Sequence, residues 1–370
     1  MDTYMESPIL SPRERAAVLW AEHVTRNTAG DRDDVYEEVR KHYSDAEFVE
    51  LTGIIGFFNR SNRGQDSLHL PLEHQDEVNK IKTSVRADTN KIRAYLDLLV
   101  EMWPDDFPQP NGDGEPEAGR NGSENGAGPR FDEILMPGAA EGLSAQGPRV
   151  PLIDTATSDP DAAFYFRAAK QFLGGKTNAA RMWAHIPHVA KLMVPFMVAI
   201  LHEGLGGRLS TRLKLMAALK TSRVNESAYC LAQMTALGRT AGITDDLAHA
   251  IGGGDYMISP LLSPRERAAV LWAEHVAMYT AKTRDDIFEE VRKHYSDPEI
   301  VELTALCTLY NMMNRVYKSL RIPIETGDAF PAKGLTVRVE PDSIRNYIQE
   351  LTASWPASFP VPNEEAPALL

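Results

Sequence analysis

The residues with the clearest chemical potential lie in the stretch 225–244, N-E-S-A-Y-C-L-A-Q-M-T-A-L-G-R-T-A-G-I-T. Ser227, Cys230 and Met234 stand at the spacing at which a C-x-x-C-x-x-x-H helix places two thiols and an imidazole. Only Cys230 of that redox set is present. Dithiol peroxide reduction needs a resolving thiol near the attacking one. The stretch therefore predicts at most a lone nucleophile, with Cys230 as a candidate catalytic residue; an inert core thiol is the alternative.

Polar side chains around this stretch are candidate substrate contacts. Asn225, Ser227 and Tyr229 flank Cys230 and could hydrogen-bond a ligand; helix caps and a half-buried tyrosine are the alternatives. Asn311 and Arg315 stand at i, i+4 on one helix face. An arginine there can receive a carboxylate through two hydrogen bonds. A structural ion pair at a repeat interface is the alternative for Arg315.

His275 is the best acid–base candidate, and it belongs to a duplicated pair. Glu274-His275 recurs as Glu22-His23. Adjacent helical positions point about 100° apart, so the two side chains of a pair do not face each other. We therefore keep His275 as a candidate catalytic residue, with a buried structural histidine as the alternative. Met234 cannot titrate and is expected only to line the site.

The other histidines do not predict a metal site. Pro187 interrupts the helix between His185 and His188, and His202 follows without a carboxylate in a recognised ligand pattern. We therefore expect no metal at these histidines.

Composition narrows the function classes. The 370 residues carry a net charge of -13, which argues against nonspecific nucleic-acid binding because that requires a basic face. No run reaches the roughly 18 apolar residues of a membrane span, and the first residues do not resemble a signal peptide. Two cysteines cannot form a disulfide framework. These features predict a cytoplasmic protein without membrane contact.

The chain contains a long internal repeat. Residues 11–24, S-P-R-E-R-A-A-V-L-W-A-E-H-V, recur unchanged at 263–276, and the offset of 252 residues persists to Asn111 and Asn363. Each copy predicts four helices, the first of which begins with a capping box and a proline at its first position. No convincing period-2 alternation of strands is present. The predicted class is all-α.

The repeat also predicts the domain layout. Residues 112–147 are rich in glycine, proline and acids, and we expect a flexible linker there. One complete helical unit (147–370) is thus preceded by a duplicated half unit (1–111), which gives a half-repeat domain, the linker and a complete domain over 148–370. The half unit has no counterpart of the Cys230 helix. Either it packs against the complete unit or its true start lies upstream of Met1.

A set of short motifs resembles one known family. The runs P-R-V-P-L-I-D (148–154), A-H-I-P (184–187), L-S-T-R-L (209–213), N-E-S-A-Y-C-L-A-Q-M (225–234), A-G-I-T-D-D (241–246), L-S-P-R-E-R-A-A-V-L (262–271) and Y-N-M-M-N-R (310–315) are similar to the carboxymuconolactone decarboxylase and alkyl hydroperoxidase D superfamily. The resemblance covers 148 to about 320 and, through the repeat, 7–63. It implies an alkyl hydroperoxidase D-like helical bundle that works without a cofactor.

The resemblance carries two activities. The peroxidase branch uses a C-x-x-C dithiol, a following histidine and a glutamate on the preceding helix; these positions fall on Ser227, Cys230, Met234 and Leu215. The decarboxylase branch uses acid–base residues on the same helices. We therefore expect cofactor-independent, lyase-type chemistry on a small carboxylated or cyclic organic molecule. The alternative is a degenerate member that binds a ligand or assembles with a partner, and a thiol peroxidase is least expected. The family implies a homo-oligomer, or a pseudo-dimer through the repeat.

Overall fold

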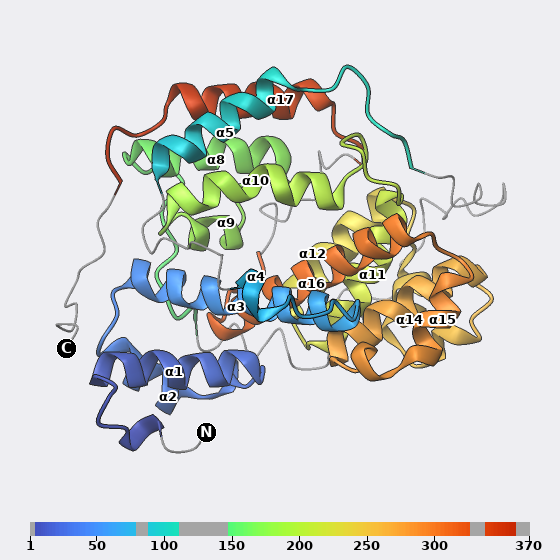
Figure 1. Cartoon of the computed structure of the whole chain (residues 1–370), viewed down its shortest axis with the longest axis horizontal. Coiled ribbons are helices and arrows are strands. Elements are labelled where there is room, and N and C mark those ends of the chain that lie inside the picture. Colours follow the sequence, from blue (N-terminus) through green and yellow to red (C-terminus); the bar gives the residue numbers. More distant parts are fainter. Residues whose placement is uncertain (1–3, 79–87, 111–146, 326–336, 360–370) are drawn as a thin grey trace. The chain divides into compact units, whose positions relative to one another are not determined.

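The computed structural model describes residues 4–78, 88–110, 147–325 and 337–359. Over these ranges the chain is helical, and its only extended pairing is an isolated bridge between Glu203 and Arg338 (Figure 1). This confirms the predicted all-α class. None of the helices in these ranges combines the length and the apolar character needed to cross a membrane. The predicted linker, Gly147 excepted, lies outside the described residues.

The chain divides into two compact units, one formed by Met1–Leu72 with Phe107–Val339 and the other by Glu73–Asp106 with Glu340–Leu370. The domain boundaries predicted at 111 and 148 do not coincide with the limits of these units, and they stay a prediction. The second unit contains α4 (Gln75–Val78), α5 (Thr89–Glu101) and α17 (Pro341–Ala353). Helices α5 and α17 are the fourth helices of the two repeat copies, and they pack on each other.

The first unit contains the other three helices of each copy and the segment between the copies. The first copy supplies α1 (Pro12–Thr25), α2 (Asp33–Arg40) and α3 (Asp45–Ser67), and the second supplies α14 (Pro264–Met278), α15 (Asp285–Arg292) and α16 (Asp297–Ser319). Between them lie α8 (Pro160–Phe172), α9 (Asn178–Trp183), α10 (Pro187–Leu201), α11 (Thr211–Val224), α12 (Ala228–Thr240) and α13 (Asp245–Gly252). Short 3-10 turns occur at Tyr4–Glu6, Ala29–Asp31, Asp255–Met257 and Ala281–Thr283.

The repeated segments fold alike down to single hydrogen bonds. The capping boxes predicted at Ser11 and Ser263 are both formed. The indole of Trp20 donates to Thr52 Oγ1 at 2.9 Å, and that of Trp272 donates to Thr304 Oγ1 at 2.8 Å. Identical local sequence therefore produces identical local geometry in two different surroundings.

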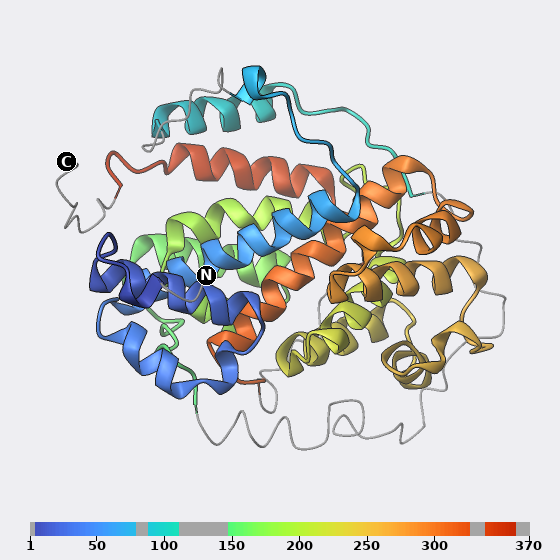
Figure 2. The ribbon, with the colours of Figure 1, turned by 60° about the horizontal axis from the view of Figure 1, so that its bottom comes forward.

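Helices α3 and α16 run antiparallel and in close contact (Figure 2). A Cβ atom added at Gly56 would lie 2.9 Å from Val316 Cγ2, whereas one at Gly64 would lie 3.8 Å from Thr308 Cγ2. Gly56 thus allows the two helices to approach. Positions 56 and 308 are repeat equivalents, and so are 64 and 316. The two contacts are therefore related by an approximate two-fold axis that passes between the helices.

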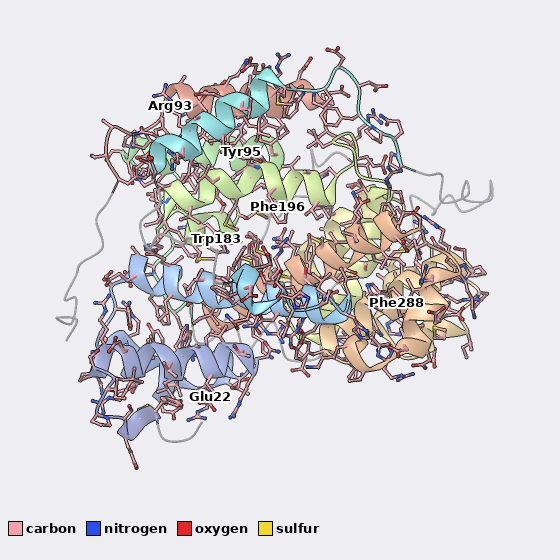
Figure 3. All side chains as sticks on the ribbon, viewed as in Figure 1. Glu22, Arg93, Tyr95, Trp183, Phe196 and Phe288 are labelled. Carbon is pink, nitrogen blue, oxygen red and sulfur yellow. The ribbon has the colours of Figure 1, made fainter. Side chains whose placement is uncertain are left out.

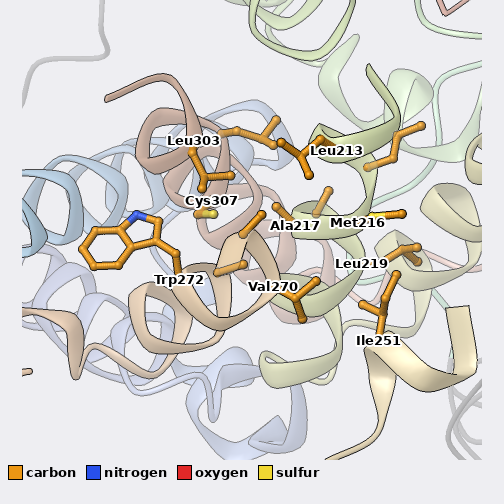
Figure 4. Close-up of a cluster of buried hydrophobic side chains, with 14 of the residues drawn as sticks. Leu213, Met216, Ala217, Leu219, Ile251, Val270, Trp272, Leu303 and Cys307 are labelled. Carbon is orange, nitrogen blue, oxygen red and sulfur yellow. The ribbon is translucent and has the colours of Figure 1, made fainter. Parts of the chain in front are cut away.

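An apolar core of the first unit surrounds α11, which packs against α12, α14 and α16. Figure 4 shows Leu213 and Met216 of α11 with Trp272 of α14 and Leu303 and Cys307 of α16. Cys307 is fully buried among these side chains. Its setting is that of a structural core thiol.

Candidate functional site

Cys230 lies in the first turn of α12. Taken alone, the stretch 225–244 favours a helix that starts near Asn225, which would place the thiol about a turn and a half into it. This expectation is wrong because α12 begins only at Ala228. Asn225 instead ends α11, and Glu226, with a φ of 54°, makes the turn between the two helices. Ser227 is the N-cap residue of α12, although its side chain makes no capping hydrogen bond.

The electrostatics of the Cys230 thiol are dominated by burial. A helix N-terminus lowers the pKa of a thiol, and the nearby Ser227 hydroxyl acts in the same direction. Burial nevertheless raises the pKa of Cys230 to about 12. The thiol is therefore protonated at neutral pH and is not an activated nucleophile.

Aromatic side chains surround Cys230. Burial and the neighbouring Cys230 raise the pKa of both Tyr310 and Tyr317 on α16. The rings of Tyr229 and Tyr317 meet edge to face with centroids 5.2 Å apart. The indole of Trp183 on α9 (Figure 3) donates to the Tyr317 hydroxyl at 3.1 Å. This setting favours neutral groups and excludes water.

A buried carboxylate stands beside this aromatic cluster. The Tyr229 hydroxyl donates to Glu325 Oε1 at 2.8 Å, and the backbone N–H of Asn178 donates to the same oxygen at 2.6 Å. Gln233 Nε2 donates to Oε2 at 2.5 Å. The Tyr229 hydroxyl in turn accepts the backbone N–H of Ala179 at 3.1 Å. Burial and the nearby Glu325 raise the pKa of Tyr229 well above its ordinary value, so its phenol stays protonated.

Glu325 was not among the residues predicted from the sequence. It follows α16 in the run I-P-I-E, far from 225–244 and outside every motif. The one local signal in the sequence is that this acid ends an apolar segment. In the structure the residue is buried and only 8% exposed. The path of the chain after α16, which brings Glu325 back to α9 and α12, could not be read from local patterns.

Asn225, Asn311 and Arg315 form a second buried network. Arg315 Nη1 donates to Asn225 Oδ1 at 2.9 Å and to Asn311 Oδ1 at 3.0 Å. Asn225 Nδ2 donates to Asn311 Oδ1 at 2.9 Å, and Asn27 of the first copy donates to the Asn225 carbonyl at 2.8 Å. Arg315 thus contacts amides, and none of the described carboxylates forms an ion pair with it.

The two remaining candidates have other surroundings. His275 Nδ1 lies 2.8 Å from Thr280 Oγ1, and His23 makes the same contact with Thr28 in the copy that lacks the Cys230 helix. Burial lowers the pKa of His275. The duplication supports its structural interpretation. Met234, one turn after Cys230, belongs to the apolar core.

The described residues thus form an all-helical fold in which one of two buried thiols, Cys230, lies at the start of a central helix. Residues 187–275 match the model of the Carboxymuconolactone decarboxylase family. Over these residues the chain is similar to that family, which confirms the resemblance seen in the sequence. The match includes α12 and most of α14; Glu325 and Arg315 lie beyond it.

Two curated proteins are also similar. The chain is 28% identical over 102 residues to the uncharacterized protein YdfG of Bacillus subtilis (strain 168), a match that covers 26% of this chain and 66% of YdfG, just under two thirds. It is 24% identical over 169 residues to the uncharacterized protein YnjA of Escherichia coli (strain K12), which covers 44% of this chain and 88% of YnjA.

Two solved structures are similar to part of the chain. One is an uncharacterized peroxidase-related protein from Silicibacter sp. TM1040, with a TM-score of 0.42 and 21% identity over 48% of this chain and 92% of that chain. The other is the debrominase Bmp8, with a TM-score of 0.40 and 20% identity over 53% of this chain and 96% of that chain. Likenesses of this size carry no functional argument.

Proposed function

We propose that the first unit is a cofactor-independent lyase that acts on a small carboxylated or cyclic organic molecule. Glu325 would transfer the proton, and Tyr229 would hold its carboxyl group in place. The observation that carries the proposal is the buried Glu325 carboxyl group, which accepts hydrogen bonds from Tyr229, Asn178 and Gln233. A carboxyl group fixed by several donors in a dry site is suited to general acid–base catalysis.

The proposed reaction is a decarboxylation. The bond between the substrate carbon and its carboxylate breaks, carbon dioxide leaves, and the electron pair stays on the substrate carbon. That carbon then takes a proton through Glu325, whose carboxylate accepts a proton from water and passes it on, so that the group ends the cycle as it began and hydroxide is released. Cys230 has no covalent part in this scheme because its pKa of about 12 keeps it protonated.

A panel of β-keto acids and carboxylated lactones, with carbon dioxide release as the readout, tests the proposal. We expect Glu325→Gln to lower kcat about 100-fold or more, within the usual contribution of an acid–base group. Tyr229→Phe removes the positioning hydroxyl and should lower kcat less while it shifts the pH profile. The matched control is Glu289→Gln, an exposed acid on α15. Unchanged turnover by Glu325→Gln would refute the assignment.

A second function is favoured by a different observation. Leu215 and Met234 occupy the positions of the family's acid and imidazole, and both are buried in the apolar core. A member that has lost these groups could bind a ligand without turning it over. Saturable binding of a panel acid to the wild-type chain, with no carbon dioxide released, would identify this function and exclude the lyase.

A further inference from the structure

Two buried arginines of the first unit lack the counter-charge that the other buried cations have. Seven lysine and arginine side chains of the described residues are buried. Five have a carboxylate oxygen at 2.6–3.0 Å: Lys191 with Asp161, Lys214 with Glu302, Lys220 with Glu274, and Arg149 and Arg321 with Asp33. The other two, Arg63 and Arg315, form no ion pair with any described carboxylate. A buried charge without a partner is costly, so an ion pair or a bound ion is expected there.

The two arginines are equivalent positions of the repeat. They are 252 residues apart, on α3 and α16, and only 8% and 4% exposed. Each uses one edge of its guanidinium for the asparagine four residues before it: Arg63 Nη1 donates to Asn59 Oδ1 at 3.3 Å, and Arg315 Nη1 to Asn311 Oδ1 at 3.0 Å. The Nε atom of each is buried and has no hydrogen-bond partner.

The two guanidiniums also act on each other across the antiparallel helix pair. Burial lowers the pKa of Arg315 to about 9, and the Arg63 charge lowers it as well. Both side chains still carry their charge at neutral pH. The approximate two-fold axis between α3 and α16 relates their positions, so the two open Nε edges are placed symmetrically about the helix contact.

Nearby acids do not neutralise this pair. Asp66, one turn after Arg63, accepts a hydrogen bond from the Tyr279 hydroxyl and lies 3.6 Å from Lys282 Nζ. Arg63 instead lies over the Tyr279 ring, 4.7 Å from its centroid. The positive charge of Arg63 and Arg315 is therefore left for an external group.

We propose that Arg63 and Arg315 together bind one small oxyanion, the carboxylate group of an organic acid, at the contact between the two repeat copies. The Nε and Nη2 edge of a guanidinium, which is left open when Nη1 is bound to an asparagine, can receive a carboxylate through two parallel hydrogen bonds. This binding site does not depend on the proton transfer proposed for Glu325, and it is formed only when both copies are present.

Titration calorimetry on the full chain at constant ionic strength tests the proposal, with succinate, inorganic phosphate and chloride as probes. We expect saturable succinate binding that weakens about 10- to 100-fold in Arg63→Gln and again in Arg315→Gln, the range for lost hydrogen bonds to a charged group. Arg26→Gln, which removes an exposed arginine, should bind as the wild type does. If phosphate bound more tightly than succinate, the ligand of the site would be a phosphoryl group, and the assignment to a carboxylate would be wrong.

The wild-type chain alone also tests the proposal if a variant fails to fold. Succinate should raise its unfolding temperature in a saturable way, and an equal ionic strength of chloride should not. Absence of this rise, or succinate binding that survives both arginine substitutions, would overturn the proposal.

Discussion

Cys230 is subject to two opposite influences. Its place in the first turn of α12 favours the thiolate, whereas its burial among Tyr229, Tyr310 and Tyr317 favours the thiol. Burial is the larger influence, because the pKa of Cys230 is raised to about 12. The motif position of this residue therefore does not make it reactive.

The corresponding prediction concerns alkylation by iodoacetamide at neutral pH. A rise in thiol pKa from 9.0 to about 12 lowers the thiolate fraction about 1000-fold. In a Cys307→Ala chain, which retains only Cys230, we expect alkylation far slower than that of a free model thiol, and a normal rate in denaturant. Native alkylation as fast as that of the model thiol would show an activated cysteine.

At the scale of elements, α3 and α16 determine how the two copies meet. The two helices approach closely at Gly56 of α3, because glycine has no side chain to hold Met312 and Val316 of α16 at a distance. The equivalent contact of Gly64 with Thr308 is looser by about an ångström. The two-fold relation between the copies is thus approximate, and its tight side lies at Gly56.

This asymmetry predicts different outcomes for two similar substitutions. Gly56→Ala should lower the free energy of unfolding by about 1–3 kcal/mol, because its Cβ would overlap the Val316 side chain. Gly64→Ala meets only ordinary contact and should be neutral or stabilising by up to about 1 kcal/mol, since alanine favours a helix over glycine. Urea unfolding measures both. Equal effects of the two substitutions would contradict the packing described.

Local patterns predicted the helices well because their signals are local. The capping boxes at Ser11 and Ser263 both form as expected. The start of α12 was misplaced because Asn225 can equally end one helix or begin the next. The Glu325 contacts and the unpaired Arg63 depend on which helices become neighbours, and no local pattern records that.

At the scale of the whole molecule, buried thiols and phenols that stay protonated make the folded chain less stable as the pH becomes alkaline. Burial raises the pKa of both Cys230 and Cys307 from 9.0 to about 12, and it also raises the pKa of Tyr165 and Tyr310. The unfolded chain loses these protons at lower pH than the folded chain does. Their stabilising effect is complete below about pH 9 and is lost as pH rises towards 12.

We therefore expect the free energy of unfolding to fall steeply above pH 9. In a chain with both Cys230→Ala and Cys307→Ala the decline between pH 9 and 10 should be clearly shallower, whatever the absolute stability of the variant. Urea unfolding at a series of pH values measures the slopes. Identical slopes in the two chains would show that the thiols titrate normally in the folded state.

The contact between α3 and α16 joins two copies of one sequence that are already linked by the peptide chain. The copies are therefore always present in equal numbers, and their encounter is intramolecular. Dilution cannot separate them, whereas it dissociates a dimer of separate subunits. The fused arrangement lets the two sides of the contact differ in sequence, as Gly56 with Thr308 and Asn27 with Tyr279 already do.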